Sequence, residues 1–263
     1  MNYPHRNGGA AARSVTTAAT PQWTVRRAAP VAQPSFPTRR FDALALMPDG
    51  GLAEVTQRAP AHPVFEGAFS ALARGTIMAT EEGPTAVEDL LPGTRIETRD
   101  DGYQTLLWIG TISLMPNSGQ GHAPVRLFRI PVDSFGPSRP MPDLMLAPHA
   151  RLLYRSSRLQ GVSPEGAAMA PVPAFEDGYH VIRVAPVSPV NVYHLAFADH
   201  QILRANGLEI ESFHPGEDLV ARIGNENLRT FQSFFPHMRS LADFGPMRLP
   251  HLSVEQFESL SEG

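Results

Sequence analysis

The sequence contains no cysteine and no lysine. Its 263 residues include 22 basic residues, and all of them are arginine. The lack of cysteine excludes disulfide bonds, thiolate nucleophiles and cysteine metal sites. The lack of lysine excludes Schiff-base and lysine general-base chemistry.

The chain also lacks a strong charge bias and any long apolar run. Its formal net charge is -4 and its pI is about 6.2, which gives no reason to expect nucleic acid or an anionic membrane as a partner. No apolar stretch approaches the roughly 20 residues of a membrane-spanning helix. The N-terminus, MNYPHRNGGAAARS, has no apolar segment of the kind found in secretory signals. These absences predict a cytoplasmic protein that binds neither nucleic acid nor membrane.

Composition divides the sequence into three parts. Residues 1–64 are rich in alanine, proline, threonine and arginine, and we expect a mostly disordered arm with a short ordered piece at Phe41–Val55. Residues 65–220 show short strand patterns separated by turn signals. Residues 221–263 show helical spacing instead. We therefore expect a flexible N-terminal arm, a central β domain and a short helical C-terminal tail.

Short strand patterns separated by turn residues indicate that the central part is all-β. Pro92-Gly93 precedes a strand at Thr94–Thr98, and Asp101-Gly102 predicts a hairpin. Asn206-Gly207 predicts a further tight turn in the segment VNVYHLAFADHQILRANGLEIESF. Prolines throughout the region argue against long helices. Gly119–Pro124 and Ser156–Gly178 look like surface loops. The fold class predicted is all-β with many short strands.

The tail contains two helical patterns. In NENLRTFQSFF, the apolar residues Leu228, Phe231, Phe234 and Phe235 recur at helical spacing. We interpret the phenylalanines as a face that docks on the β domain. The segment SVEQFESL carries a capping-box pattern, Ser253 with Gln256.

Three blocks together resemble the Hint domain, the module shared by hedgehog autoprocessing domains and inteins. ALARGTIMATEEGPTAVEDLLPGTRIETRDDG (Ala71–Gly102) resembles its opening, LMLAPHARLLY (Leu144–Tyr154) its Thr/Ser-x-x-His block, and VYHLAFADHQILRANGLEIES (Val192–Ser212) its closing Val-Tyr-Asp-Leu…His-x-Phe-x-Ala-Asn-Gly block. Bacterial stand-alone members are the most similar. The resemblance implies a pseudo-twofold all-β disc in which the three blocks meet at one centre.

The resemblance also implies a self-cleavage chemistry whose groups this chain lacks. Family members begin with an acyl shift in which a thiol or hydroxyl attacks the preceding carbonyl, assisted by a histidine and by donors to the oxyanion. The nucleophile position matches Ala71. The polar and histidine positions of the middle block match Ala147 and Ala150. A methyl group performs none of these roles, so the resemblance implies a degenerate centre.

The closing block departs from the family pattern as well. Asp199 matches an acidic position, but the family histidine falls at Gln201, with His200 one residue before it. The His-Asn ending of an intein is replaced by Glu211-Ser212, so asparagine cyclisation is excluded. Since partial catalytic sets retain little activity, these joint losses predict that self-cleavage is lost.

Two alternatives remain open. In the first, the Ser70 hydroxyl supports residual self-cleavage, with His149 or His200 as the base. In the second, His194, Asp199 and His200 join His149, His180 or His214 in a metal-dependent hydrolase. Their spacing matches no metal signature, so scattered histidines are the favoured interpretation. In a strand, the shift from Ala150 to His149 turns the side chain to the opposite face, which favours a rim position for His149.

The sequence as a whole predicts a Hint-like protein that has lost self-cleavage and acts as a binding or structural module. We expect no cofactor and no metal, and the partner is an unknown peptide or protein. An extended peptide could add to the strand edges of such a fold. An enzyme is the less favoured interpretation.

Overall fold

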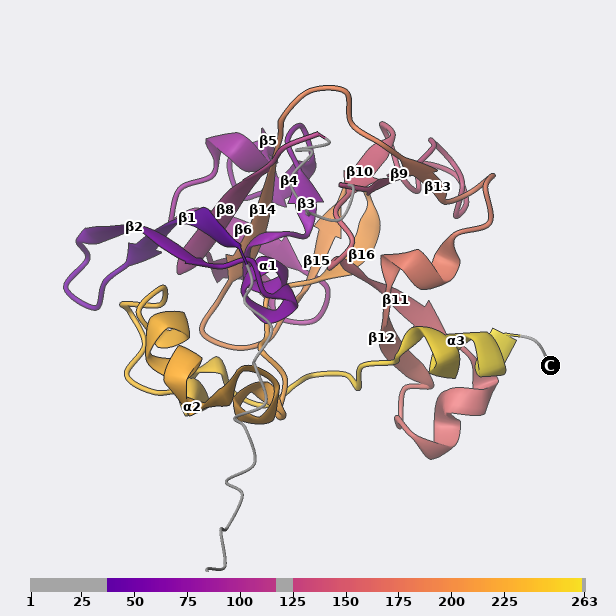
Figure 1. The fold of residues 1–263 in the computed structure, drawn as a ribbon. Helices are drawn as coiled ribbons and strands as arrows, with labels where there is room; N and C mark the ends of the chain where they lie inside the picture. The colour runs from indigo at the N-terminus through magenta and orange to yellow at the C-terminus, as the bar shows by residue number, and fades with distance from the viewer. Residues whose placement is uncertain (1–36, 117–124, 262–263) are drawn as a thin grey trace, which may run out of the picture. The chain divides into compact units, whose positions relative to one another are not determined.

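A computed structural model gives the structure of residues 37–116 and 125–261, and these are the residues described below. The chain forms two antiparallel sheets with helices α1 (Pro63–Phe69), α2 (Leu219–Gln232) and α3 (Val254–Ser261) (Figure 1). The all-β prediction is therefore confirmed, with helices added before the first block and after the last. None of the helices among these residues combines the length and apolar character needed to cross a membrane.

The first sheet has the strand order β13-β9-β10-β3-β14-β8-β1-β2. Its strands are β1 (Thr38–Leu46), β2 (Leu52–Pro60), β3 (Leu72–Ala73), β8 (Trp108–Leu114), β9 (Leu127–Ile130), β10 (Leu144–Leu146), β13 (Ile182–Val184) and β14 (Val190–Ala196). The two-residue strand β3 lies between β10 and β14, so the opening block is placed in the middle of this sheet.

The second sheet has the order β12-β11-β16-β15-β4-β6-β7, with β5 paired to β4. Its strands are β4 (Ile77–Thr80), β5 (Gly83–Ala86), β6 (Arg95–Thr98), β7 (Gly102–Thr105), β11 (Arg151–Arg155), β12 (Ala167–Pro171), β15 (Ile202–Ala205) and β16 (Leu208–Glu211). Short 3₁₀ helices lie at Val87–Asp89, Ser157–Gly161, Val172–Phe175 and Leu241–Phe244.

The predicted tight turns are present for the expected reasons. Asp101 precedes Gly102, which has a φ of 66° and pairs with Thr98 across the β6–β7 hairpin. Asn206 and Gly207 have φ values of 48° and 86° and join β15 to β16. The buried Asn206 side chain also accepts a hydrogen bond from the Ile77 amide at 2.6 Å. This asparagine therefore shapes its own turn and holds a neighbouring strand.

The first sheet begins well before the opening block. β1 and β2 form a hairpin, and β1 also pairs with β8, with Asp42 opposite Thr111 and Ala45 opposite Trp108. Alternate β1 residues Phe41, Ala43 and Ala45 are buried, which is the period-2 pattern of a half-buried strand. The hairpin lies within residues 1–64, for which the sequence predicts a mostly disordered arm with one ordered piece; residues 1–36 are outside the described part.

An aromatic core joins this upstream segment to the downstream helix. Phe41 of β1 and Phe69 of α1 lie with ring centroids 5.6 and 5.0 Å from Phe234, just after α2. Trp108 stacks on Phe235 at 4.6 Å, and its indole nitrogen donates to the Phe234 carbonyl at 2.7 Å. The predicted docking role of the tail phenylalanines is therefore confirmed. Residues on both sides of the three blocks share one core.

The tail differs in detail from its sequence pattern. α2 begins at Leu219, before the predicted segment, and kinks at Gly224, where φ is 71°. α3 has the predicted capping box: Gln256 N–H donates to Ser253 Oγ at 3.1 Å, and Ser253 N–H donates to Gln256 Oε1 at 2.8 Å. Before α3, His251 forms a parallel bridge with Met169 of β12. The tail thus extends the edge of the second sheet (Figure 1).

The prediction of a surface loop at Ser156–Gly178 is wrong. Within 156–178, Ala167–Pro171 forms β12, and its first four residues are buried beside β11 and α3. The run of alanines lacks the large apolar residues by which a strand is recognised, yet small side chains suit a strand covered by a helix. The other predicted loop, Gly119–Pro124, lies wholly outside the described residues.

Candidate functional site

The three blocks meet through backbone hydrogen bonds around Ala71. The Ala71 amide donates to the Tyr193 carbonyl at 3.0 Å, and the Ala147 amide donates to the Ala71 carbonyl at 2.8 Å. The Ala150 amide donates in turn to the Ala147 carbonyl at 3.0 Å. All three alanine side chains are fully buried. The structure therefore brings together the positions that the resemblance assigns to nucleophile, polar group and histidine, with a methyl group at each.

Ser70 lies one residue before this centre, at the C-terminal end of α1. Its side chain is buried, and its hydroxyl makes no hydrogen bond to His149, His194 or His200. Without a base in contact, a serine hydroxyl is a weak nucleophile. The structure thus places Ser70 beside the expected centre but does not bring the two proposed bases to it.

A cavity of about 140 Å³ opens beside this centre. Its polar lining comes from four elements and the segments next to them: His149 and Arg151 near β11, His194 of β14, Glu211 of β16 with His214 after it, Arg222 of α2, and His251 of the tail. Its apolar lining includes Val64, Phe213 and four prolines. Strands and helices remote in sequence therefore contribute charged groups to one small space.

His149 and His194 face each other near Gly67 of α1. His194 Nδ1 donates to the Gly67 carbonyl at 2.9 Å, while the His149 ring packs against the bare Cα of Gly67. Burial lowers the pKa of both imidazoles to about 4. For His149, the nearby His194, Arg151 and Arg222 lower the pKa further. Both rings are therefore neutral at pH 7.

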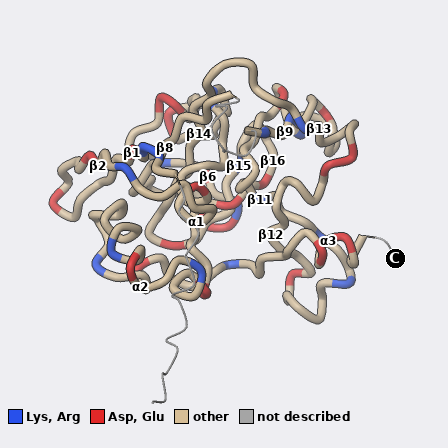
Figure 2. The backbone as a smooth tube through the Cα atoms, in the orientation of Figure 1, with Lys and Arg blue, Asp and Glu red and all other residues tan. Residues whose placement is uncertain are grey.

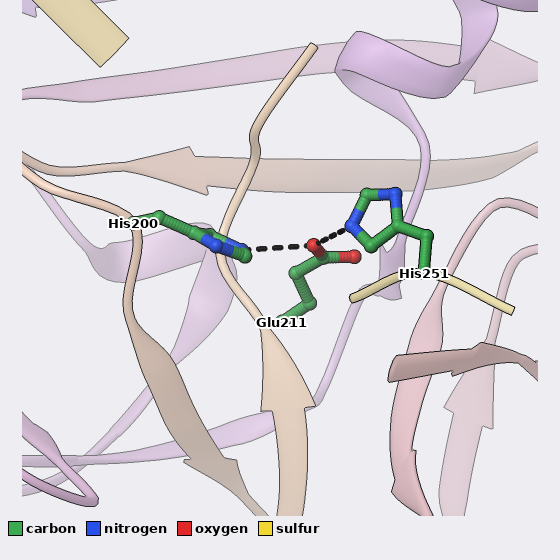
Figure 3. A group of neighbouring side chains, drawn as sticks. All are labelled: His200, Glu211 and His251. Carbon is green, nitrogen blue, oxygen red and sulfur yellow. Dashed lines mark hydrogen bonds and ion pairs between the residues drawn. The ribbon is translucent and has the colours of Figure 1, made fainter. Parts of the chain in front are cut away.

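Glu211 is the buried anion of the site. Its Oε1 lies 2.8 Å from His200 Nε2 and also contacts His251 Nε2 (Figure 3). Arg151 Nε lies 3.7 Å from the other carboxylate oxygen. Burial opposes ionisation, but His251 and His200 outweigh it and hold the pKa of Glu211 well below its usual range. The carboxylate is thus charged and partnered on both oxygens.

His200, Glu211 and His251 are close enough together to suggest a metal site among the described residues. The hydrogen bonds around His200 argue against it. The Arg248 amide donates to His200 Nδ1 at 3.0 Å, so this nitrogen presents its lone pair. In the neutral ring the proton is then on Nε2, which lies 2.8 Å from Glu211 Oε1 and has no lone pair for a metal. The trio therefore fits a hydrogen-bonded network better than a metal site.

Of the other residues in the sequence-derived metal set, His149, His194 and His214 line the cavity, whereas Asp199 and His180 are not part of its lining. Asp199 is exposed in the turn before β15, next to Gly245. His180 pairs with Asp177 at 2.6 Å, and His214 uses both ring nitrogens on backbone groups. Gln201, at the family histidine position, is buried with its backbone bonded to Ser212. These residues hold loops and turns.

The comparisons with known proteins now decide the family. The family model described as "Hint domain" matches residues 70–217, which is more than half of the chain. The chain belongs to the Hint-domain family. No curated protein matches it.

Two solved structures of Hint-like proteins are similar to this chain. One is the solution structure of a bacterial intein-like domain from Clostridium thermocellum, with 13% identity and a TM-score of 0.37, covering 55% of this chain and 99% of that one. The other is the AceL NrdHF class 3 split intein in a splice-inactive variant linked to GSH, with 13% identity and a TM-score of 0.37, covering 54% and 97%.

The sequence alone does not indicate four polar residues of the cavity in this Hint domain: Arg151, Glu211, Arg222 and His251. His194, named above as a candidate metal ligand, occupies the Asp position of the Val-Tyr-Asp-Leu block. Glu211 stands where an intein has its His-Asn ending, and the sequence does not show that its charge is buried. His251 lies outside residues 70–217 and reaches Glu211 through a parallel bridge that no sequence pattern announces.

Proposed function

We propose that this Hint-domain protein does not cleave itself and acts as a binding or structural module. The main observation behind the proposal is the burial of the two peptide bonds on either side of Ser70 and the lack of a nucleophile beside them. Phe69, Ser70 and Ala71 are all buried, and the position of the nucleophile holds a methyl group. A side chain without an oxygen or sulfur atom cannot accept the acyl group, so the first step has no acceptor.

The segment upstream of these bonds supports the proposal independently. In a self-cleaving protein this segment becomes a separate product. Here β1 pairs with β8 and α1 packs its phenylalanines into the aromatic core. Removing residues 1–69 would therefore strip a strand pair and several buried rings from the fold, at a cost of many kcal/mol by the usual scale for buried aromatic side chains. The chain is built to keep both parts together.

The test is the intact mass of the purified full chain. We expect a single species of 28.7 kDa that persists on incubation at neutral pH with a thiol or with dilute hydroxylamine, which trap thioesters and esters. Strong alkaline hydroxylamine is to be avoided, since it also cuts the Asn206–Gly207 bond. Fragments that end or begin between Phe69 and Ala71 would overturn the proposal.

The rival function, residual self-cleavage through Ser70, has its own control. If fragments form, Ser70→Ala should abolish them, because it removes the oxygen. The matched variant Ser113→Ala, which changes a hydroxyl on the exposed side of β8, should leave them unchanged. Fragments that persist in Ser70→Ala would reject Ser70 as the nucleophile.

A further inference from the structure

The cavity next to Ala71 contains a positive charge that its own residues do not neutralise. Arg151 and Arg222 both line it. Glu211 is the lining carboxylate, and its contacts with His200, His251 and Arg151 use both of its oxygens. Arg222 has an exposed partner, Asp218, at 3.5 Å outside the lining. Two guanidinium groups therefore face one carboxylate that is already paired.

The neighbouring groups respond to this positive field. The pKa of the Arg151 guanidinium is lowered by burial and, after the opposing effect of Glu211, by Arg222. The two arginines thus oppose each other across the cavity. Arg222 also contributes to the low pKa of His62 and His149. Like charges that share a partly enclosed space are an arrangement that an anion stabilises.

His149 supplies an unused hydrogen-bonding group. Its ring lies in the lining and makes no side-chain hydrogen bond to another described residue. His194 and His214, in contrast, are tied to backbone carbonyls. The half-buried His149 ring is therefore available to hydrogen-bond to a ligand or an ordered water in the cavity.

We propose that this cavity binds the carboxylate of a small ligand with an apolar body, such as the C-terminal residue of a peptide or a short free acid. Arg222 and Arg151 would face the carboxylate, and His149 would hydrogen-bond to it. The apolar part would lie against Val64, Phe213 and the lining prolines. The peptide form of the ligand rests on the binding role proposed above, whereas recognition of the carboxylate does not.

A monocarboxylate fits better than a phosphate or a metal ion. A phosphate dianion would place two charges beside Glu211, which shares the same lining. A cation would face Arg151 and Arg222. The cavity of about 140 Å³ has room for a few water molecules or a small side chain with its carboxylate. Size and charge therefore both favour a singly charged organic anion.

Binding should be coupled to proton uptake by His149. The charged and titratable groups around this ring are Arg151, His194, Arg222 and, across the cavity, Glu211, His214 and His251. Burial and the positive groups keep the pKa of free His149 at about 4. An anion nearby should raise that pKa by about one to two units. Affinity should then increase as the pH falls from about 7 to 5 for a ligand that stays ionised.

The experiment is an NMR titration of the full chain with selectively labelled histidine, with His149→Gln used to assign the signal. N-acetylalanine is the peptide-end probe, propionate the free-acid probe, N-acetylalaninamide the neutral control and inorganic phosphate the alternative anion. We expect saturable shifts of His149 with both carboxylates, with Kd on the order of millimolar for such small ligands. Tighter binding of N-acetylalanine than of propionate would identify a peptide end.

Arg222→Gln is the test variant, since its side chain is part of α2 and partly exposed, so folding should survive. Its Kd for the carboxylates should rise about ten-fold, as expected for one charge-assisted contact. Arg229→Gln, on the exposed side of the same helix, is the matched control and should bind as the wild type does. Equal weakening in both variants would mean non-specific charge attraction and would overturn the proposal.

Three further results would also overturn it: no saturable shift of His149, equal binding of the neutral amide, or tighter binding of phosphate than of either carboxylate. The mass spectrum of the same sample separates this failure from that of the proposed function. An intact chain that binds no carboxylate rejects this inference alone. A fragmented chain rejects the proposed function whatever the titration gives.

Discussion

Substituting Glu211 with glutamine tests the buried network at the centre of the Hint domain. Glutamine keeps the size of the side chain and one acceptor oxygen but loses the negative charge. His200 and His251 then share one neutral acceptor, and the second oxygen facing Arg151 becomes a donor. The substitution thus places the amide N–H group of glutamine opposite the Arg151 guanidinium, so two hydrogen-bond donors face each other in the protein interior.

The expected loss is about 2 to 3 kcal/mol in the free energy of unfolding at pH 7. Removing one partner of a buried ion pair costs about 3 to 5 kcal/mol, and the retained oxygen offsets part of that. For a domain of this size the loss corresponds to a fall in Tm of about 4 to 12 °C. Glu81→Gln is the control, since Glu81 and Arg95 form an exposed pair whose loss should cost less than about 1 kcal/mol.

The pH dependence gives the sharper result. The pKa of Glu211 is lowered on folding from the ordinary 4.5. Its stabilising effect is therefore fully present above about pH 4.5 and is lost as the pH falls through the folded value. The difference in stability between wild type and Glu211→Gln, measured by urea unfolding, should be constant from pH 7 to 5 and should shrink below that. Equal stability at pH 7, or a difference that grows in acid, would refute the reasoning.

Two further predictions concern single residues of the core. His237 has both ring nitrogens buried without a hydrogen bond, and burial lowers its pKa to about 4. Because an unfolded histidine binds a proton near pH 6.5, the free energy of unfolding should fall as the pH drops from 6.5 to 4. In urea titrations, His237→Phe should remove about one proton from that pH dependence. An unchanged pH slope would show that the ring is solvated. A Cβ added at Gly110 would lie 2.6 Å from Phe69 Cδ1 and closer still to the Trp108 ring, so Gly110→Ala should lower the Tm markedly. Gly161 has open space around it, so Gly161→Ala should leave the Tm unchanged. Similar Tm values for the two variants would contradict the packing described.

The sequence was informative where local chemistry decides structure. Asn206-Gly207 and Asp101-Gly102 specify their hairpins because Asn206, Gly207 and Gly102 have positive φ angles that few other residues adopt. Ser253 and Gln256 specify the start of α3 through hydrogen bonds within one turn. The Hint resemblance placed Ala71 next to the middle block, since three short motifs in order fix a known topology. Each of these signals lies within a few residues of what it predicts.

The rest depends on contacts between distant parts of the chain. Nothing near Glu211 indicates that His251 will reach it, 40 residues later, through the edge of β12. The alanines of β12 show no apolar–polar alternation, because Ala168 and Ala170 pack with Phe257 of α3 whereas Ala167 is buried on the other face with Ile202 and Leu249. The hairpin at β1 and β2 is hidden in a segment rich in alanine and proline, and its partner is β8. Sequence motifs therefore could not predict which residues meet in the cavity lining.

The shared aromatic core has a consequence for how this protein can be handled. A fragment cut to residues 70–217 would match the family description yet lack three of the contacts of Trp108, because Phe69, Phe234 and Phe235 lie outside it. In such a fragment β8 would be an edge strand with a partly uncovered indole, which favours aggregation. The segment that matches the family and the segment that folds as one unit thus have different boundaries. The longer segment, which includes β1, α1 and α2, is the one to express.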